Sequence, residues 1–557
     1  MPDARVSNTI TGRDAFLRVL SDEGVTKMFG NPGTTELPIM HALTSAPEIG
    51  YVLGLQEAVV IAMADGYARA SGKLVSCNVH VAPGLGNAIG SIYTSLMSGT
   101  PMIVTAGQQE QGHGLTEPLL YAPLVPIAAP VVKWATEVTR IEDLPRILRR
   151  AAKVATTAPT GPVFISLPGD ILNNEAAIDM AEATRVDTAV RPSDAALEHL
   201  AKRLLAAKKP VILAGHEIAT SDAFAETAAL AETLGAPVLQ QTVAWGAHFP
   251  SEHPAYLGAL NRDQKNVRRI LSDHDLMLCV GADVLKMSVW SETEPLPETT
   301  AVAMIGQRDW EMGKNFPAEI AMRADVKETL KALVPLLQKL GGTMLAGKAK
   351  ASLAEIATRN WSSQRAARKA KLTQPASEKP LHAEWAMMRL SEKLPQDAIL
   401  VEEGLTSSTT LFHYFAFRDR NSFFGNVSGG IGWGIAAAVG VQIAEPKRRV
   451  VAVIGDGSAM YSITALWTAA NQKLPVIFVI ANNQGYQILK NRLKLFHGND
   501  KPIGMDFNDP PMDISGIARG FGVAAERVDT AAGFEAAMDK ALARTDGPTL
   551  IELMVRS

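Results

Sequence analysis

The sequence predicts an α/β protein built from three domains with parallel sheets. Its 557 residues are enough for about three or four domains, at about 100–200 residues each. Apolar strand-like runs alternate with helical patterns along most of the chain, which is typical of parallel sheets flanked by helices. A polar stretch from Asn173 to Asp194 and a lysine- and alanine-rich stretch from Gly341 to Lys379 interrupt this alternation and are interpreted as connectors. We therefore expect domains at residues 1–180, 190–340 and 380–557.

The first and third domains share a pattern of residues at a fixed spacing. A shift of 374 residues places Gly66 on Gly440, Pro101 on Pro475 and the strand MIVTAG on VIFVIA, without a gap. A duplicated domain would explain these coincidences, and chance similarity between small α/β units is the alternative. A true duplication predicts two similar domains that face each other across a site.

Local patterns predict several elements. The stretch from Lys73 to Val81 is strand-like, PGLGN indicates a turn, and a helix is expected from Ala88. The two cysteines, Cys77 and Cys279, lie in apolar runs and are predicted to be buried strand residues. Two such cysteines can form neither a disulfide framework nor a zinc cluster.

Charge and hydropathy argue against several classes of partner. The net charge is −3 with both signs spread along the chain, which disfavours nucleic acid or an anionic membrane as the main partner. The most apolar stretch, from Gly430 to Ala444, is too short and too rich in glycine for a transmembrane helix. The N-terminal residues lack the apolar core of a signal peptide, so we expect a cytoplasmic protein.

A pair of motifs in the third domain predicts a metal and phosphate site. VVAVIGDGSAMYS is interpreted as a buried strand, a Gly-Asp-Gly turn and a helix start, and Asn482 and Asn483 follow the next buried strand, 26 and 27 residues after Asp456. Neighbouring parallel strands end at the same edge of a sheet, where such sheets bind ligands. Since Mg²⁺ prefers oxygen ligands, Asp456, Asn483 and the backbone carbonyl of Gly485 form a candidate set. Gly457 permits the turn, and the helix after it would point N–H groups at a phosphate. A dinucleotide site is the rival interpretation, but no G-x-G-x-x-G follows the first strand.

This pair of motifs resembles the signature of thiamine-diphosphate enzymes. The chain is similar to the decarboxylase and synthase family that includes benzoylformate decarboxylase, pyruvate decarboxylase and acetolactate synthase, and it resembles benzoylformate decarboxylase most. The resemblance covers nearly the whole length. It is strongest at FGNPGTTELP, LQEAVVIAMADGYARASG, NVHVAPGLGNAIGS, GGIGWGIAAAVGVQIAEP and AVIGDGSAMYSITALWTAA.

The family resemblance implies roles for the three domains. Residues 1–180 would bind the pyrimidine ring of the cofactor, residues 190–340 would form a middle domain, and residues 380–557 would bind the diphosphate. The implied cofactors are thiamine diphosphate and Mg²⁺. The resemblance also implies a homo-oligomer, a tetramer arranged as a dimer of dimers, in which each site lies between two chains.

Glu57 is the residue to which the resemblance assigns activation of the cofactor, through a hydrogen bond to a pyrimidine nitrogen. The run VVIAMA that follows is apolar, so the helix is expected to be buried. A buried carboxylate needs a specific partner. The alternative is a solvated acid at a helix start, where the helix dipole favours it.

Further cofactor contacts are implied by the same alignment. Ile431 would hold the cofactor in a bent shape, and the carbonyl of Gly429 would face the pyrimidine. Ser407 and Ser408 would contact the diphosphate, in an alignment that needs a small gap. The remaining implied cofactor-binding residues are Gly33, Gly457, Ser458 and Tyr486.

His80 is the main candidate for proton transfer to a substrate. It ends a strand, and histidine is the side chain best suited to move protons near neutral pH. A hydrogen-bonded residue at a strand end is the alternative. Thr34 falls where benzoylformate decarboxylase has a serine that contacts the substrate carboxylate. His113 lies in a polar loop where related decarboxylases carry histidines.

Three positions depart from the benzoylformate decarboxylase pattern. Ser288 stands where that enzyme has a second active-site histidine. Arg492 replaces an aromatic residue of the substrate pocket, and Ile488, one helical turn earlier, is larger than the alanine there. We expect a smaller pocket with an added positive charge, which puts benzoylformate itself in doubt. Alternatively, Arg492 belongs to a solvated basic run with Lys490 and Lys494.

These features together predict a carbon–carbon lyase that converts a 2-keto acid to an aldehyde and CO₂ without oxidation. A carboligase, a synthase or a 2-hydroxyacyl-CoA lyase on the same scaffold is the alternative, because Arg492 could bind a carboxylate or a phosphate. Intact Glu57, His80, Asp456 and Asn483 disfavour a homologue that only binds the cofactor. The middle domain lacks a glycine fingerprint, which disfavours a nucleotide-dependent oxidoreductase.

Overall fold

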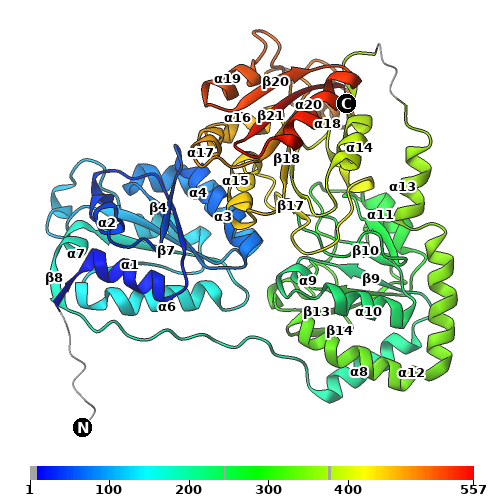
Figure 1. Cartoon of the computed structure of the whole chain (residues 1–557). Coiled ribbons are helices and arrows are strands. Elements are labelled where there is room, and N and C mark those ends of the chain that lie inside the picture. The colour runs from blue at the N-terminus through cyan, green and yellow to red at the C-terminus, as the bar shows by residue number, and fades with distance from the viewer. Residues whose placement is uncertain (1–8, 244, 374–377, 557) are drawn as a thin grey trace. The chain divides into compact units, whose positions relative to one another are not determined.

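The structure, a computed structural model, describes residues 9–243, 245–373 and 378–556. Its contacts divide the chain into two compact units. The first contains the described residues of Met1–Val186, Val401–Thr406 and Asn426–Ser557, and the second those of Asp187–Leu400 and Ser407–Gly425. Large sheets flanked by helices make up both units, which confirms the predicted α/β class (Figure 1).

The first sheet has six parallel strands and lies in the first unit. In spatial order its strands are β3 (Gly50–Leu53), β2 (Lys27–Gly30), β4 (Val75–Val79), β5 (Met102–Gln108), β7 (Pro162–Pro168) and β6 (Ala135–Glu137). Its helices are α1 (Gly12–Asp22), α2 (Leu37–Leu43), α3 (Glu57–Ser71), α4 (Val81–Ser98), α5 (Leu124–Ala128), α6 (Leu144–Thr156) and α7 (Gly169–Asn173). A separate antiparallel pair joins β1 (Thr9–Thr11) to β8 (Glu175–Ala177).

The segment PGLGN does not form the predicted turn. It lies in the first two turns of α4, which begins at Val81 rather than at Ala88. A proline is tolerated in the first turn of a helix, where no N–H is needed. A Cβ atom on Gly84 would lie 3.2 Å from Oε1 of Glu57, so this glycine allows close approach of α4 to Glu57. The prediction that Cys77 and Cys279 are buried strand residues is confirmed.

The middle sheet lies in the second unit and is doubly wound. In spatial order its parallel strands are β11 (Tyr256–Ala259), β10 (Val238–Gln240), β9 (Pro210–Ala214), β12 (Leu276–Val280), β13 (Ala301–Gly306) and β14 (Ile320–Arg323). The other helices and short strands of this unit are α8 (Asp194–Ala206), α9 (Glu217–Thr220), α10 (Phe224–Leu234), α11 (Gln264–Leu271), α12 (Val326–Ala357), α13 (Trp361–Lys369), α14 (Ala383–Lys393), β15 (Leu381–His382) and β17 (Phe423–Gly425).

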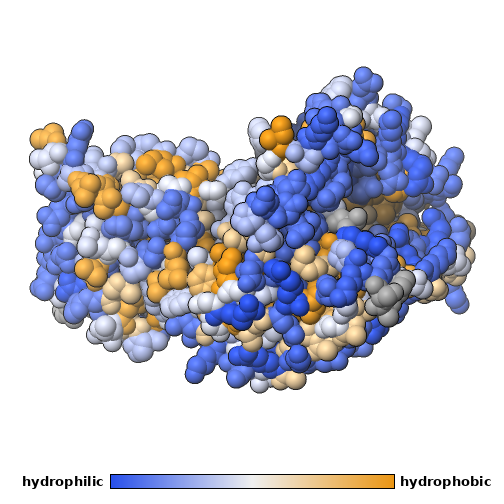
Figure 2. Space-filling view, turned by 90° about the horizontal axis from the view of Figure 1, so that it is seen from above, coloured by the Kyte–Doolittle hydropathy of each residue, from blue (hydrophilic) through white to orange (hydrophobic). Residues whose placement is uncertain are grey.

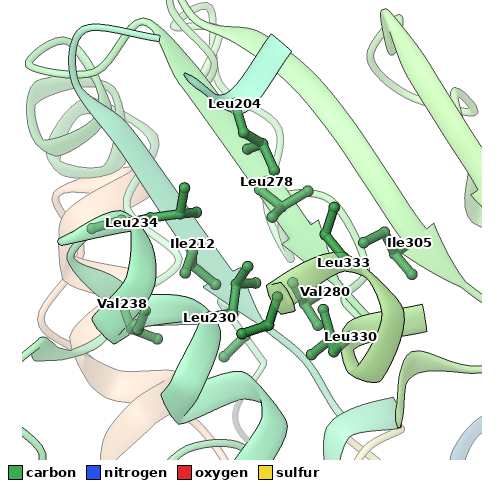
Figure 3. Packing of buried hydrophobic residues seen from close by; sticks show 14 of the residues in the cluster. Leu204, Ile212, Leu230, Leu234, Val238, Leu278, Val280, Ile305, Leu330 and Leu333 are labelled. Carbon is green, nitrogen blue, oxygen red and sulfur yellow. The ribbon is translucent and has the colours of Figure 1, made fainter. Parts of the chain in front are cut away.

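Alternation of side chains along β9 explains why both faces of this sheet are covered. Ile212 and Ala214 belong to one buried cluster, and Val211 and Leu213 belong to another. Successive side chains of a strand point to opposite faces, so an uninterrupted apolar strand needs apolar partners on both sides. Figure 3 shows the first cluster, where leucines of α8, α10 and α12 pack on β9, β10, β12 and β13. The predicted connector from Gly341 to Lys379 is largely helical, since α12 extends to Ala357 and α13 follows.

The third sheet has the same strand order as the first. It runs through β16 (Ile399–Glu403), β18 (Val450–Gly455), β19 (Ile477–Asn482) and β21 (Thr549–Arg556), and β20 (Ala524–Val528) pairs with β21. This order matches β2, β4, β5, β7 and β6 of the first sheet. Its helices are α15 (Gly434–Ala444), α16 (Asp456–Ser462), α17 (Ala465–Asn471), α18 (Gln487–His497), α19 (Ile514–Gly520) and α20 (Ala531–Ala543).

Helices α3 and α15 cross at the two glycines that the 374-residue shift had paired. A Cβ atom on Gly66 would lie 2.2 Å from the carbonyl oxygen of Ala437, and one on Gly440 would lie 1.8 Å from that of Met63. The shift converts one of these pairs into the other, because 66 becomes 440 and 63 becomes 437. The crossing is therefore nearly two-fold symmetric, and the similar order of the two sheets supports the duplication interpretation.

Hydropathy on the surface agrees with the sequence analysis. The face shown in Figure 2 is mostly hydrophilic, with hydrophobic residues in separate patches. Within the described ranges, no helix combines the length and the apolar character needed to cross a membrane.

A buried acid occupies the point where the strand order of the middle sheet reverses, between β9 and β12. Glu217 follows β9, and Gly281 and Gly306 end the neighbouring strands so closely that a Cβ on either would lie within 3 Å of its side chain. The backbone N–H of Gln307 donates to Oε2 of Glu217 at 2.7 Å. Burial raises the pKa of Glu217 to about 7, although the charge of Arg308 acts in the opposite direction.

The raised pKa of Glu217 should be visible in how the free energy of unfolding depends on pH. Glu217 binds a proton more tightly in the folded protein, where its pKa is about 7, than at its ordinary value of 4.5. The free energy of unfolding should therefore fall by about 3 kcal/mol as pH rises through this interval. Glu217→Gln, which stays neutral, should remove most of that decrease in urea titrations from about pH 4 to about pH 8. Glu198→Gln on the exposed face of α8 serves as the control, and an equal slope in all three proteins would contradict the assignment.

Candidate functional site

Asp456 and Asn483 lie at one edge of the third sheet, as predicted. Asp456 follows β18 and Asn483 follows β19, and these strands are parallel neighbours. Asp456 is only 4% exposed. Its Oδ1 accepts from the N–H of Gly457 at 2.8 Å, and its Oδ2 accepts from the N–H of Gly485 at 3.1 Å. Burial raises the pKa of Asp456 above its ordinary value, so a nearby cation would offset the cost of a buried negative charge.

The loop after β19 is shaped by the side chain of Asn482. Its Oδ1 accepts from the N–H of Gln484 at 3.0 Å, and its Nδ2 donates to the buried Glu552 at 2.8 Å. Gln484 has φ +61°, an unusual conformation for a residue with a side chain. This turn presents half-buried Asn483 and buried Gly485 beside Asp456. One carboxylate, one amide and one carbonyl are oxygen donors that fit Mg²⁺, with phosphate and water completing its shell.

Gly457 and Tyr486 are packed against each other next to this edge. A Cβ atom on Gly457 would lie 2.5 Å from the ring of Tyr486, so only glycine fits there. The Tyr486 ring in turn meets the edge of Phe507, with centroids 4.7 Å apart. Ser458 is buried in the first turn of α16. Sequence analysis assigned Gly457, Ser458 and Tyr486 to cofactor binding, and they lie together at this edge.

Glu57 opens α3 and is 7% exposed. Its Oε1 accepts from Nδ2 of Asn31 at 3.1 Å, and its Oε2 accepts from Nδ2 of Asn87 at 3.0 Å. These partners come from the end of β2 and from α4, so the carboxylate is fixed by its own domain. Within the described ranges, no hydrogen bond or ion pair connects Glu57 to the candidate metal-binding residues Asp456, Asn483 and Gly485.

His80 is held by Glu36, a residue that sequence analysis missed. His80 Nδ1 lies 2.7 Å from Oε2 of Glu36 and 3.2 Å from the hydroxyl of Thr35. Glu36 is fully buried and also accepts from the N–H of Gly107 at 2.8 Å and of Gly33 at 2.9 Å. An acid that anchors one imidazole nitrogen fixes the tautomer and leaves Nε2 to exchange protons. No hydrogen bond from Nε2 to another residue of the described ranges is present.

The backbone on both sides of His80 is tightly constrained. A Cβ atom on Gly33 would lie 2.1 Å from Nδ1 of His80, so glycine is required for the histidine to reach Glu36. Val81, which follows His80, is buried with φ +43°, a strained conformation for a β-branched residue. Thr34 begins a short 3₁₀ helix and is exposed. The structure therefore brings Gly33 and His80 together.

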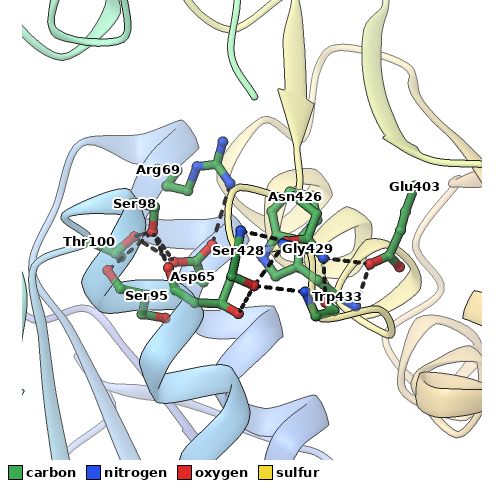
Figure 4. Close-up of polar contacts among 12 residues, drawn as sticks. Asp65, Arg69, Ser95, Ser98, Thr100, Glu403, Asn426, Ser428, Gly429 and Trp433 are labelled. Carbon is green, nitrogen blue, oxygen red and sulfur yellow. Dashed lines mark hydrogen bonds and ion pairs between the residues drawn. The ribbon is translucent and has the colours of Figure 1, made fainter. Parts of the chain in front are cut away.

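A glycine-rich loop of residues 426–433 carries Gly429 and Ile431. Because the family resemblance predicts that these two residues contact the cofactor, we name this segment the cofactor loop. Glu403, at the end of β16, accepts from the N–H groups of Gly432, Trp433 and Gly434 at 3.1, 3.2 and 2.9 Å. Figure 4 shows this carboxylate, which is buried, beside the loop. Burial raises the pKa of Glu403 to about 7 in spite of these donors.

The side chain of Asn426 completes the support of this loop. Its Nδ2 donates to Glu403 at 2.7 Å, and its Oδ1 accepts from the N–H of Ser428 at 3.0 Å. Gly429 is exposed with φ +80°, which favours glycine, and Ile431 is half-buried. Hydrogen bonds from Asn426 and to Glu403 thus support the loop along its length.

Four further predicted residues are His113, Ser288, Ser407 and Ser408. His113 is exposed, and its Nδ1 lies 3.2 Å from the hydroxyl of Thr116. Ser288, which is exposed, and Ser407 and Ser408, which are buried, belong to the second compact unit.

Ile488 and Arg492 are both half-buried, one turn apart on α18. Arg492 forms no ion pair with any residue of the described ranges, Asp500 included. Its neighbour Lys490 differs, because it pairs with Asp506. The basic run on this helix is therefore not uniform, because Arg492, unlike Lys490, has no acidic partner among the residues that the structure describes.

Signals for the missed residues were weak in the sequence. Glu36 stands in NPGTTEL and Glu403 follows the apolar run AILV, and both patterns are common at the ends of buried strands. Asn31 and Asn87 are polar residues in turns or helices, where such residues are ordinary. Only the long-range contacts distinguish them.

Comparisons with known proteins match three segments of the chain to domains of one enzyme family. Residues 10–118 match the thiamine pyrophosphate enzyme N-terminal TPP binding domain, residues 197–333 match the central domain, and residues 405–553 match the C-terminal TPP binding domain. Thiamine pyrophosphate (TPP) is another name for thiamine diphosphate. The chain is 33% identical over 550 residues to a benzoylformate decarboxylase of Pseudomonas aeruginosa, covering 98% of both chains. It is 30% identical over 494 residues to the large subunit of acetolactate synthase isozyme 3 of Escherichia coli, covering 86% of this chain and 83% of the relative.

Solved structures show the same similarity in three dimensions. A thiamine diphosphate-dependent 4-hydroxybenzoylformate decarboxylase of Rhodococcus jostii superimposes with a TM-score of 0.86 at 32% identity, covering 98% of this chain and 99% of that one. Benzoylformate decarboxylase of Polynucleobacter necessarius gives a TM-score of 0.87 at 30% identity, covering 98% of both chains.

Proposed function

Because the chain belongs to the thiamine pyrophosphate enzyme family, we propose that it is a Mg²⁺-dependent lyase that decarboxylates a 2-keto acid to an aldehyde and CO₂. The observation that carries this proposal is the His80–Glu36 pair, a buried acid that anchors one nitrogen of a half-exposed histidine. Similarity to decarboxylases over nearly the whole chain supports the reaction type. Thiamine diphosphate, when bound, supplies the nucleophilic carbon and the electron sink that this decarboxylation needs.

In this proposal, different domains bind different parts of the cofactor. Residues 1–180 bind the pyrimidine ring, residues 380–557 bind the diphosphate, and residues 190–340 form the middle domain. Asp456, Asn483 and the carbonyl of Gly485 hold Mg²⁺, and the desolvated carboxylate of Asp456 is matched by the ion's charge. Ser407, Ser408, Gly457, Ser458 and Tyr486 line the diphosphate side.

Glu57 holds a proton at a ring nitrogen of the pyrimidine. Its two amide neighbours, Asn31 and Asn87, each donate to one oxygen and so keep the carboxylate in one orientation. The carbonyl of Gly429 accepts from the pyrimidine amino group, and Ile431 supports the bent shape. Gly33 contacts the cofactor beside His80.

His80 delivers a proton to the carbon that loses CO₂. One proton must replace the departing carboxyl group for an aldehyde to form, and Nε2 is the nitrogen left to provide it. Thr34 is exposed beside the Gly33 turn and contacts the substrate carboxylate through its hydroxyl. His113 and Ser288 are further candidates for contact with the substrate, from loops.

A carboligase, a synthase or a 2-hydroxyacyl-CoA lyase is the second candidate. The similarity to acetolactate synthase favours carbon–carbon bond formation with a second carbonyl compound in place of protonation. The half-buried guanidinium of Arg492 could bind a carboxylate or phosphate of such a substrate.

A panel of 2-keto acids with product analysis tests the proposed function. With thiamine diphosphate and Mg²⁺ present, CO₂ and the matching aldehyde should appear in equal amounts from at least one acid. Glu57→Gln should lower that turnover by at least about 100-fold, because the ring nitrogen loses its proton partner. A coupled ketone that forms only when a second carbonyl compound is added would favour the synthase instead.

We expect sites shared between two chains, as the family resemblance implies, with Glu57 and Asp456 of one site supplied by different chains. Asp456→Ala should abolish Mg²⁺-dependent binding of thiamine diphosphate in calorimetry. Mixing these chains with Glu57→Gln chains should restore about a quarter of the wild-type activity, since half of the dimers are mixed and each has one intact site. Mixed oligomers, verified by mass, that remain inactive would refute shared sites.

Arg492 should favour a substrate with a second negative group. A half-buried guanidinium without an acidic partner is costly, and a substrate anion would pair with it. Arg492→Phe should lower kcat/KM for a 2-keto diacid by at least about 30-fold and raise that for benzoylformate. Lys494→Phe, on the exposed side of α18, is the control. The same ranking of substrates in both variants would assign Arg492 to the solvated surface.

A further inference from the structure

The cofactor loop is tied to the first domain of its own chain by the side chain of Trp433. This indole donates from Nε1 to Oδ2 of Asp65 at 2.8 Å. Asp65 lies on α3, two turns after Glu57, and is fully buried. Figure 4 shows Asp65 between the loop and the hydroxyl groups of the first domain.

Every oxygen of Asp65 has a defined donor, so its position is fixed. Oδ1 accepts from the hydroxyls of Ser98 at 3.1 Å and Thr100 at 2.5 Å. Oδ2 lies 3.5 Å from the guanidinium of Arg69, which also stacks over the Trp433 ring at 4.9 Å from its centroid. Because a buried carboxylate is costly without such donors, this arrangement holds the indole firmly.

A second bridge reaches the loop next to Gly429. The hydroxyl of Thr94, on α4, lies 2.8 Å from that of Ser428. Ser428 Oγ also accepts from the N–H of Gly430 at 3.1 Å. The backbone on both sides of Gly429 is thus connected to the first domain as well as to Glu403.

Two acids on α3, one at its start and one near its middle, have different partners. Glu57, at its start, is bonded only to Asn31 and Asn87 of its own domain in the described chain, whereas Asp65 faces the cofactor loop. Helix α3 is buried along most of its length and crosses α15 at Gly66, next to Asp65.

We propose that Asp65 is a positioning residue for the cofactor: through Trp433 it fixes the loop that carries Gly429 and Ile431 in its own chain. This inference rests on the proposed function, which places the pyrimidine ring of thiamine diphosphate against that loop. With shared sites, each α3 then acts at two of them. Its Glu57 serves the diphosphate domain of the partner, and its Asp65 orders the loop of its own diphosphate domain.

Removal of single hydrogen-bond donors tests the proposal. Trp433→Phe removes the N–H that reaches Asp65, together with part of the ring under Arg69. The control must therefore lose the same atoms at an indole that a guanidinium also covers. Trp361→Phe is a matched control, because this buried indole donates to the carbonyl of Phe412 at 2.7 Å in the other compact unit. Calorimetry at saturating Mg²⁺ should show a dissociation constant for thiamine diphosphate about tenfold higher in Trp433→Phe and less than about twofold higher in the control. Equal shifts in the two variants, or unchanged affinity in Trp433→Phe, would overturn the proposal.

Two variants of Asp65 separate positioning from folding. Asp65→Asn keeps an acceptor for the indole and can donate to the hydroxyls of Ser98 and Thr100, so its affinity for the cofactor should stay within about threefold of wild type. Asp65→Leu loses the acceptor and should bind at least about tenfold more weakly, with the free energy of unfolding measured in parallel. Equal cofactor affinity in the two variants would contradict positioning by Asp65.

Mixed oligomers show which of the two chains at a shared site must carry Trp433 for tight cofactor binding. In the mixture of Glu57→Gln and Asp456→Ala chains, the live site uses the cofactor loop of the Glu57→Gln chain. Trp433→Phe should raise the KM for thiamine diphosphate more when this chain carries it than when the Asp456→Ala chain does. Equal effects from both placements would overturn the assignment. A parent mixture without activity would refute shared sites alone, and the calorimetric comparison would then decide the role of Asp65.

Discussion

The close crossing of α3 and α15 is the constraint on which the first compact unit depends. Two backbones approach so closely that Gly66 and Gly440 have no room for a Cβ atom. This contact fixes α3, which begins with Glu57, and α15, which follows the cofactor loop. Because each glycine faces the other helix near a two-fold axis, the crossing also places the two similar sheets in a symmetric relation. A side chain at either glycine would separate both helices and disturb both groups of site residues.

Buried carboxylates that accept hydrogen bonds are the second feature that recurs among the candidate site residues. Asp456, Glu36 and Glu403 each accept two or three backbone N–H groups, and Glu552 accepts from the side-chain Nδ2 of Asn482. A buried acid is costly without donors, so each turn has one favoured conformation. The strained backbone at Val81 and Gln484 persists because these contacts compensate for it. Rigid turns then keep the side chains in place for chemistry.

Much of the fold and part of the site could be predicted from the sequence. Strands such as VVAVIG and PVIFVIAN can be identified from their continuous apolar sequence, because buried parallel strands need apolar side chains on both faces. Asp456 and Asn483 follow two such strands, so their proximity was a consequence of sheet geometry. The prediction of a turn at PGLGN was wrong, because this segment is helical and its Gly84 allows α4 to approach Glu57 closely. Glu36 and Glu403 could not be found, because their partners are far away in the sequence.

The sequence by itself determined the class of the fold, the buried strands, the motif proposed to bind a metal and the family resemblance, all of which are local patterns or fixed spacings. Only the tertiary structure decided which acid anchors His80, which amides hold Glu57, and which side chains connect the cofactor loop to α3. These are contacts between residues dozens or hundreds of positions apart, such as Asp65 with Trp433. No periodicity encodes them, because a hydrogen bond depends on where two elements meet in space, and packing around the glycines at the helix crossing sets that meeting point.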